Sequence, residues 1–505
     1  MKPNMKSVWV MALTAMCTLK ATAQTKDPAH VIISPNATLS KLDTTFRGAI
    51  SKWSNQALKE KDYKLIKAHP SAANFPGEVK PNYKFIDREV KITHQKNSDA
   101  LVPIVSKLDY SGQWSNNLYS TGLYAIAGEY IEITVPKGLN TQGMIVQIGA
   151  HSDRLDQWVA GKEDWRRMPL VVKKEELKTG THRFASPFGG LIYIGYPPRG
   201  ENWEATFKIT HAIASPRFIL GVTTAEEWKK QLQDNKAPWG ELATKNVIIT
   251  VMDSVLQKVT DPEHTMKLWD LIIEGEMDLA QIPLPFYRAQ RFVVDEHIGG
   301  GFMHSGYPMM VHHSPSRKMI SADVIANPEL LMKPSGGGAN WGFFHEIGHN
   351  MQNMDWVFGG TTEVSNNLFS LYMFDRLVGG RDNSHTAISN ASTQKILKSY
   401  FAEGPSYEKW KKDPWTGLTT FRQLQEGFGW ETFKTFFRAY HKLPFKNGRA
   451  KDQEKIDFFV KTFSQSAKRN VAPFFIQWGI PVSESVVKEL EILPGWMPFN
   501  FPPLN

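Results

Sequence analysis

Cysteine is nearly absent from this sequence of 505 residues, with Cys17 as its single example. Cys17 lies in an N-terminal stretch that we expect to be removed, so the mature chain would contain none. A chain without cysteine has no disulfides and no thiolate metal ligands. The protein must therefore hold its fold by packing an apolar core.

The first residues have the pattern of a secretory signal peptide. Lys2 and Lys6 give a positive start, a short apolar stretch follows, and Ala21-Thr22-Ala23 fits the small-residue cleavage pattern. We expect cleavage before Gln24, and hence a secreted, periplasmic or cell-surface protein. A lipid anchor on Cys17 is the weaker alternative, because bulky Met16 stands where a small residue normally precedes an acylated cysteine.

The sequence also lacks long apolar runs beyond the N-terminus and lacks clusters of basic residues. No run there is long enough to span a bilayer, so we expect no transmembrane segment. Losing the three lysines of residues 1–23 lowers the formal charge from +9 to +6. That charge is spread along the chain, which argues against a nucleic-acid partner.

Length and local pattern predict several packed units behind the signal peptide, residues 1–23. Residues 24–95 form a helical lead-in, with a helix expected over Thr38–Glu60. Residues 96–215 carry short strands separated by Gly and Pro turns, which favours a β-sandwich-like domain. Residues 216–505 are mixed and then mainly helical, so the expected class is α+β.

The expected helices and strands follow from the periodic spacing of apolar residues and from a helix-capping pattern. Alternation or apolar runs predict strands at Tyr130–Val135, Met144–Ile148, Leu191–Tyr196, Ala205–Ile209 and Asn246–Val251. Thr224-Ala-Glu-Glu227 has the pattern of a capping box at a helix start. Helical spacing predicts further helices at Trp341–Phe358, Thr362–Val378, Trp430–Lys442 and Glu454–Ala467.

One motif carries chemistry, the stretch His345-Glu-Ile-Gly-His349. On a helix, His345 and His349 lie one turn apart on the same face and can bind one ion together. Glu346 lies one position round, where it can reach a water on that ion. Two histidines with a glutamate between them are typical of zinc peptidases.

A third ligand is expected from the next helix. Gly359-Gly360 is predicted to end the first helix, and Thr361-Thr362 to cap a second one that brings Glu363 to the ion. Gly348 inside the first helix costs about 1 kcal/mol relative to alanine, and a close approach by the second helix would explain it. Two histidines and one carboxylate leave a position for water, the catalytic form of a zinc site.

Supporting roles are expected around this site. Glu346 would act as the general base, with His304 and Tyr307 as candidates to stabilise the oxyanion. Asn350, Gln352, Asn366 and Asn367 are candidates to orient the ligands, and Asn367 is preferred because it lies four residues after Glu363.

The loop through Gly338 and Asn340 could pair with an extended substrate, and Trp341 could stack on a sugar, although a core position is the commoner role for tryptophan. His312-His313 is interpreted as a loop pair more readily than as a second metal site.

The motif and its surroundings resemble the enhancin-type, mucin-degrading gluzincin peptidases. The likeness covers about residues 100–500, including 120–125, 147–151, 188–193, 303–308 and 474–479. It implies a β-sandwich-like domain ahead of a thermolysin-like catalytic domain with a helical C-terminal part. It also implies a host-associated bacterial source and cleavage of O-glycosylated, mucin-like proteins next to glycosylated Ser or Thr.

Two other functions compete with this one. The protein could be a secreted glycan-binding protein with a structural zinc, but a structural site needs no base, and Glu346 is present. It could also be a general zinc protease with no glycan requirement, which sequence separates poorly because substrate choice depends on pocket shape.

Overall fold

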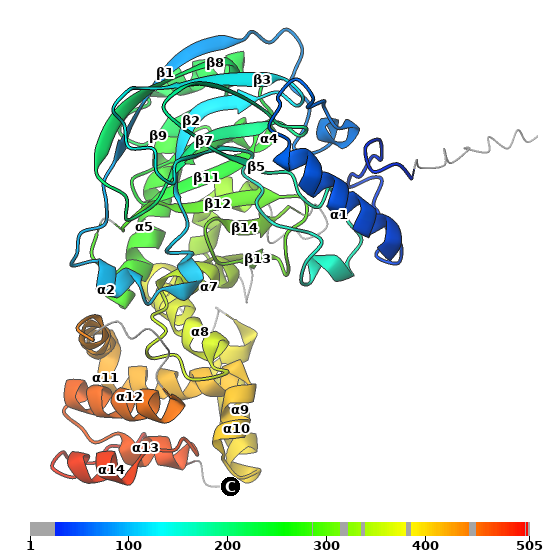
Figure 1. The fold of residues 1–505 in the computed structure, drawn as a ribbon. Coiled ribbons are helices and arrows are strands. Elements are labelled where there is room, and N and C mark those ends of the chain that lie inside the picture. The colour runs from blue at the N-terminus through cyan, green and yellow to red at the C-terminus, as the bar shows by residue number, and fades with distance from the viewer. Residues whose placement is uncertain are drawn as a thin grey trace, which may run out of the picture.

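The computed structural model describes residues 26–284, 286–313, 322–334, 339–379, 385–443, 451–499 and 501–502. Figure 1 shows a β domain at one end, a mixed α/β layer in the middle and a stack of helices at the other end. The protein is thus of mixed α+β class, with an N-terminal β domain and a helical C-terminal region. No described helix is both long and apolar enough to cross a membrane.

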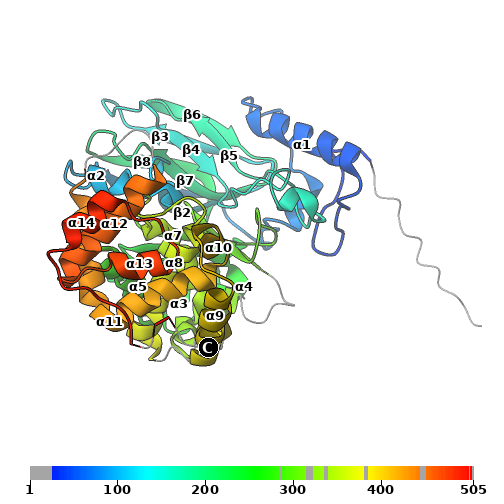
Figure 2. The same ribbon diagram turned by 90° about the horizontal axis from the view of Figure 1, so that it is seen from below.

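The lead-in contains one long helix, α1 (Thr44–Lys59), which lies beside the β domain (Figures 1 and 2). It begins later than the expected Thr38, because the Asp43 side chain accepts a hydrogen bond from the Phe46 N–H and so caps the helix there. The helix buries an apolar face that includes Phe46, Ile50 and Leu58. A short 3₁₀ turn, Pro70–Ala73, follows.

The β domain is built on an eight-stranded sheet with the order β5-β4-β7-β2-β8-β3-β6, and β1 pairs with β8. The long strand β8 belongs to both halves of the sheet, which close on one shared apolar core. The strands are β1 (Ile86–His94), β2 (Asn117–Ala125), β3 (Tyr130–Val135), β4 (Ile145–Ile148), β5 (Lys173–Glu176), β6 (Gly180–Ala185), β7 (Gly190–Tyr196) and β8 (Trp203–Ala214).

Short helical segments lie between these strands. They are α2 (Val102–Val105) and the 3₁₀ turns η2 (Asp109–Ser111) and η3 (Ala160–Lys162). Strand β3 has the expected bounds, whereas β4 begins one residue late because the Met144 N–H bonds to the Thr141 carbonyl in a turn. Strand β8 runs well beyond the expected Ala205–Ile209.

The middle layer is a six-stranded mixed sheet with the order β13-β14-β12-β11-β10-β9. Its strands are β9 (Arg217–Ile219), β10 (Trp239–Ala243), β11 (Val247–Met252), β12 (Gln290–Asp295), β13 (Met303–His304) and β14 (Met309–His312). Helices α3 (Ala225–Asp234), α4 (Asp253–Leu256) and α5 (Pro262–Ala280) belong to this layer. The capping box expected at Thr224 is confirmed, with both hydrogen bonds to Glu227 present.

Two adjacent helices, α7 (Ala339–Met351) and α8 (Thr362–Met373), follow the sheet. The expectation that the first runs to Phe358 is wrong: it ends at Met351, and the Met354 N–H bonds instead to the Lys107 carbonyl. The second continues as a π-helical turn, Phe374–Val378. Before α7 lie α6 (Ala322–Ala326) and the 3₁₀ turn Pro328–Met332.

The C-terminal region is helical, as Figure 2 shows from below. It comprises the turn Thr386–Ile388, α9 (Asn390–Ala402), α10 (Tyr407–Lys412), α11 (Pro414–His441), α12 (Asp452–Ala467), α13 (Ala472–Gln477) and α14 (Glu484–Leu490). Helix α11 is kinked at Gly429, whose φ is 74°, so the expected helix from Trp430 is its second half. Its buried aromatic side chains continue the core that lies beneath α8.

Candidate metal centre

Three side chains from α7 and α8 converge on one point. His345 and His349 lie one turn apart on α7, and Glu363 lies in the first turn of α8. The Oε2 atom of Glu363 is 3.0 Å from His345 Nε2 and 3.6 Å from His349 Nε2. Their ligand atoms all lie within 4.8 Å of one another, so one metal ion can be held by all three.

Close packing of α8 on α7 produces this geometry, and Gly348 permits it. A Cβ atom at this glycine would lie 2.7 Å from both Asn366 Oδ1 and Phe369 Cβ. The Asn366 amide also donates a 2.7 Å hydrogen bond to the His345 carbonyl. The expectation that Gly348 admits a second helix is therefore confirmed.

The protonation of the His345 ring is fixed by Asn367. Asn367 Oδ1 lies 2.9 Å from His345 Nδ1 and also accepts a hydrogen bond from the Trp341 indole N–H. Because an indole only donates, the atom facing His345 is the amide oxygen, and Nδ1 must carry the proton. Nε2, which faces Glu363, is then the ring atom that can give up its proton and coordinate a metal, as a zinc ligand must.

Gln352 determines in the same way which ring nitrogen of His349 carries a proton. Its amide nitrogen donates to the Thr362 carbonyl at 2.9 Å and to Ser365 Oγ at 2.6 Å, so its oxygen faces His349 Nδ1 at 3.1 Å. A carbonyl only accepts, and this orientation leaves Nε2 of His349 free for a metal. Both imidazoles and the Glu363 carboxylate thus form a donor set that fits zinc.

The pKa values of the two glutamates at the centre agree with a metal-binding role for Glu363 and a proton-transfer role for Glu346. Hydrogen bonds from His345 and His349 hold the pKa of the Glu363 carboxyl well below its usual range, so it is ionised. Burial raises the pKa of Glu346, although the two histidines oppose this shift. A carboxylate with a raised pKa beside a metal position is suited to accept and return a proton.

His304 lies close enough to Glu346 for their charges to interact. Its Nε2 is 2.7 Å from Asp153 Oδ2 and its Nδ1 is 2.9 Å from the Ser305 carbonyl. Burial alone would lower the pKa of His304, but these partners raise it to about 9. The structure therefore places a positive charge, with both nitrogens already paired, beside Glu346.

The Tyr307 side chain extends instead toward the β domain. Its hydroxyl accepts a 3.3 Å hydrogen bond from the Leu118 N–H of β2, and its ring lies 3.5 Å beneath the Arg288 guanidinium. This places Tyr307 in the contact between the domains.

Two of the residues expected to bind substrate, Asn340 and Trp341, have buried side chains. Asn340 is buried, donates to the Lys333 carbonyl and accepts from the Trp341 N–H. The Trp341 ring is buried against Phe374 and Trp415, so its faces are not open to a sugar. The expectation that Trp341 stacks on a sugar is therefore wrong, because its ring belongs to the core. The expected pairing of the loop backbone with substrate stays a prediction. Gly338 lies outside the described residues.

Two residues near the centre carried no signal in the sequence. Tyr110, from η2, places its ring 5.0 Å from that of His349 and its hydroxyl 3.3 Å from Thr362 Oγ1. Asp153, from the β domain, pairs with His304. Each is far from the motif along the chain, and only the tertiary fold brings it near.

His312 and His313 belong to no group of three or more ligating side chains among the described residues.

Comparison with known proteins also assigns this chain to a family of metallopeptidases. A family model described as peptidase M60, enhancin and enhancin-like, matches residues 211–479, more than half of the chain. The chain belongs to the M60 peptidase family. A second model, for the N-terminal domain of M60-like peptidases, matches residues 95–210 of this M60 chain. The metal centre lies within the first match, so the chain carries a metallopeptidase domain.

Curated relatives of this M60 chain include TRPM8 channel-associated factor 2 of Homo sapiens. It is 36% identical over 398 residues, which cover 78% of this chain and 41% of the human protein. The TRPM8 channel-associated factor homolog of Xenopus laevis is 32% identical over 395 residues, covering 78% and 42%. The M60 chain thus spans about two fifths of the length of these relatives.

Solved structures share the fold of the M60 chain. A functionally unknown conserved protein mutant from Bacillus anthracis has a TM-score of 0.64 at 21% identity, covering 83% of this chain and 82% of that one. IMPa from Pseudomonas aeruginosa in complex with an O-glycopeptide has a TM-score of 0.61 at 15% identity, covering 85% and 54%. The ZmpB metallopeptidase from Clostridium perfringens has a TM-score of 0.59 at 18% identity, covering 80% of both chains.

Proposed function

We propose that the protein is a secreted, zinc-dependent endopeptidase that cleaves O-glycosylated, mucin-like proteins next to a glycosylated Ser or Thr. The observation that carries the chemistry is the convergence of His345, His349 and Glu363, with Glu346 beside them. The expected catalytic layout is thermolysin-like, with two ligands on one helix and the third on the next.

A bound zinc ion would polarise the scissile carbonyl and lower the pKa of a water molecule toward about 7. Glu346 would accept a proton from the attacking water and later deliver it to the leaving amine. The protonated His304 would offer positive charge near the developing oxyanion. Asn367 and Gln352 would keep the two imidazoles in the tautomer that the metal requires.

The substrate class has separate support. Neighbours in fold include IMPa, solved in complex with an O-glycopeptide and with T-antigen. A site that hydrogen-bonds sugar hydroxyls leaves its own polar groups unpaired when the sugar is missing. Such a penalty supplies discrimination of roughly 10⁴ between a glycosylated and a bare peptide.

The test is to incubate the purified protein with a glycosylated mucin fragment and with the same polypeptide after enzymatic removal of its O-glycans. Mass spectrometry of the fragments should show cleavage beside glycosylated residues in the first sample and almost none in the second. Equal cleavage of both would leave the zinc chemistry standing and remove the glycan requirement. N-terminal sequencing of the exported protein should begin at Gln24.

The alternative of a glycan-binding protein with a structural zinc makes a different prediction. In that case Glu346→Gln would leave every function unchanged, because a structural site has no use for a base. A carboxylate that is not a ligand but lies near enough to all three ligands for their charges to act on it favours the enzyme.

A further inference from the structure

A pocket with two arginines among its lining residues lies where the β domain meets the mixed sheet, on the side of β9 and α3. It has a volume of about 520 Å³, and Arg88, Thr121, Gly122, Ser215, Arg217 and Gln231 are among the residues that line it. None of the residues that form the metal centre lines this pocket. It is therefore a separate site.

Two arginine side chains from different strands meet in this pocket. Arg88 Nη1 donates a 2.9 Å hydrogen bond to the Gly122 carbonyl, and Arg217 Nη1 donates one of 2.9 Å to the Ser120 carbonyl. A Cβ atom on Gly122 would lie 3.1 Å from Arg88 Nη1 and 3.7 Å from Arg217 Cδ, so the two side chains flank this one residue. Neither arginine forms an ion pair with a carboxylate in the described part of the chain.

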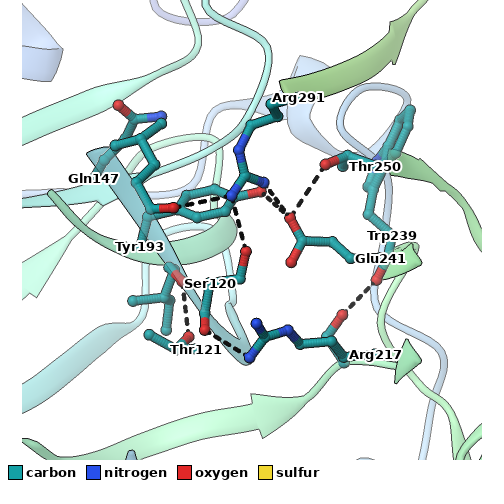
Figure 3. Close-up of polar contacts among 12 residues, drawn as sticks. Ser120, Thr121, Gln147, Tyr193, Arg217, Trp239, Glu241, Thr250 and Arg291 are labelled. Atoms are coloured by element: carbon teal, nitrogen blue, oxygen red, sulfur yellow. Dashed lines mark hydrogen bonds and ion pairs between the residues drawn. The ribbon is translucent and has the colours of Figure 1, made fainter. Parts of the chain in front are cut away.

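Figure 3 shows a buried carboxylate, that of Glu241, near Arg217 and Arg291. It is already engaged, because Arg291 Nη1 lies 2.6 Å from Glu241 Oε1, which also accepts from the Tyr193 and Thr250 hydroxyls. The Glu241 carboxylate thus pairs directly with Arg291, and its charge also acts on Arg217. Counting Lys230, Glu227 and Asp234, which also line the pocket, leaves an excess of one positive charge around it. An anion bound in the pocket would balance this charge.

The state of Arg217 agrees with this imbalance. Its Nε atom is buried and has no hydrogen-bond partner among the described residues. Burial lowers the pKa of Arg217, and the Glu241 carboxylate opposes this shift only in part. Acidic groups at the pocket rim are engaged elsewhere: Asp234 pairs with Lys230 at 3.3 Å, and the Glu227 carboxylate caps α3 through the Thr224 N–H.

We propose that this pocket binds an oxyanion, a carboxylate or a sulfate ester, carried by a sugar. The planar fork of a guanidinium matches both groups, and two forks side by side can hold one such anion. The volume is that of a small-molecule site and is larger than a bare inorganic anion needs. The choice of a sugar as carrier rests on the proposed function, whereas the preference for an anion does not.

The test is calorimetric titration of the mature, full-length protein with 3′-sialyllactose, galactose 6-sulfate and lactose. At least one charged sugar should bind about tenfold or more tightly than neutral lactose, because charge-assisted hydrogen bonds are the strong ones. Arg88→Gln should weaken that binding by about tenfold or more. The control Arg183→Gln removes the same charge from an exposed arginine of β6 that does not line this pocket, and should leave binding unchanged.

Binding of sialyllactose alone would assign a carboxylate, and binding of the sulfated sugar alone a sulfate ester. If Arg88→Gln does not fold, as judged by circular dichroism, Arg217→Lys provides the second variant and should also weaken binding, because it keeps the charge but loses the fork. Equal affinity for charged and neutral sugars would overturn the proposal, as would equal effects of the pocket and control variants. The titration measures binding and not turnover. A failure of this proposal would therefore leave the result of the peptidase assay unchanged.

Discussion

Glu346 and Glu276 are carboxylates withdrawn from water on neighbouring helices, and their surroundings give them opposite roles. Glu346 faces His345, His349 and His304, whose charges stabilise its ionised form against the effect of burial. Glu276 on α5 is fully buried, and neither of its oxygens has a hydrogen-bond partner among the described residues. The surroundings of Glu346 therefore suit the proposed exchange of protons, whereas burial favours the protonated form of Glu276.

We predict that Glu346→Gln keeps its zinc and loses nearly all turnover. The change removes proton transfer and the orientation of the attacking water, a loss of roughly 10²–10⁴-fold. His349→Ala should lose both metal and activity, because it removes a ligand. Metal analysis beside the glycopeptide assay separates the two outcomes. Release of zinc by Glu346→Gln would show that this residue is a ligand and not the base.

We predict that Glu276→Gln stabilises the protein at high pH. Burial raises the pKa of Glu276 well above its usual range, so the folded chain keeps a proton that the unfolded chain loses above about pH 4.5. Folding stability then falls as pH rises, by about 1.4 kcal/mol per pH unit until the folded pKa is passed. Glutamine does not titrate, and its advantage over glutamate should grow by up to about 3 kcal/mol between pH 5.5 and pH 8.

Denaturant unfolding at both pH values measures this difference. Glu263→Gln is the matched control, since Glu263 lies on the same helix but is exposed and pairs with Lys267. A surface substitution of this kind changes stability by less than about 0.5 kcal/mol. An advantage of Glu276→Gln that does not change with pH would contradict a protonated carboxyl.

At the scale of the elements, the contact between α7 and α8 determines the metal geometry, and we predict that Gly348→Ala disrupts it. The added methyl meets Phe369 Cβ at 2.7 Å, an atom that cannot move without its helix. Overpacking costs about 1–3 kcal/mol and outweighs the gain of about 1 kcal/mol in helix propensity. Stability and zinc affinity should both fall, as thermal unfolding and zinc titration would measure.

Gly342→Ala is the control on the same helix. Its added methyl would lie 2.7 Å from the terminal methyl of Met303, which can rotate away. This variant should keep its zinc affinity and lose little stability. If Gly348→Ala proved as harmless as Gly342→Ala, the two helices would not need this close approach.

Elements set by local chemistry were the ones that sequence predicted well. Strand β3 follows from its alternation and α3 from its capping box, and both depend on neighbouring residues alone. The end of α7 depends on the Lys107 carbonyl, which is distant along the chain, so Gly359-Gly360 gave a false signal. The shared face of His345 and His349 follows from helical spacing, and Glu363 reaches them through the packing of α8 on α7. The positions of Tyr110 and Asp153 follow only from the tertiary fold.

At the scale of the whole molecule, a buried polar network joins the β domain to the mixed sheet. Arg291 of β12 donates to Glu241 of β10 and also to Ser120 Oγ of β2, and Tyr193 of β7 donates to the same carboxylate. The side chains of Arg291 and Glu241 are 1% and 3% exposed. No local pattern reveals such a network, because its members come from four strands.

We predict that Glu241→Gln destabilises the whole molecule by about 3–5 kcal/mol, the typical cost of removing one partner from a buried ion pair. The change removes the carboxylate that pairs with Arg291 and whose charge acts on Arg217. Glu132→Gln is the control, because Glu132 pairs with Arg183 near the surface, where an ion pair contributes about 0–1 kcal/mol. Chemical unfolding measures both variants, and zinc titration of the folded protein should give an unchanged affinity, since the contacts between α7 and α8 do not include Glu241. Equal stability of the two variants would mean that packing, and not this network, joins the domains.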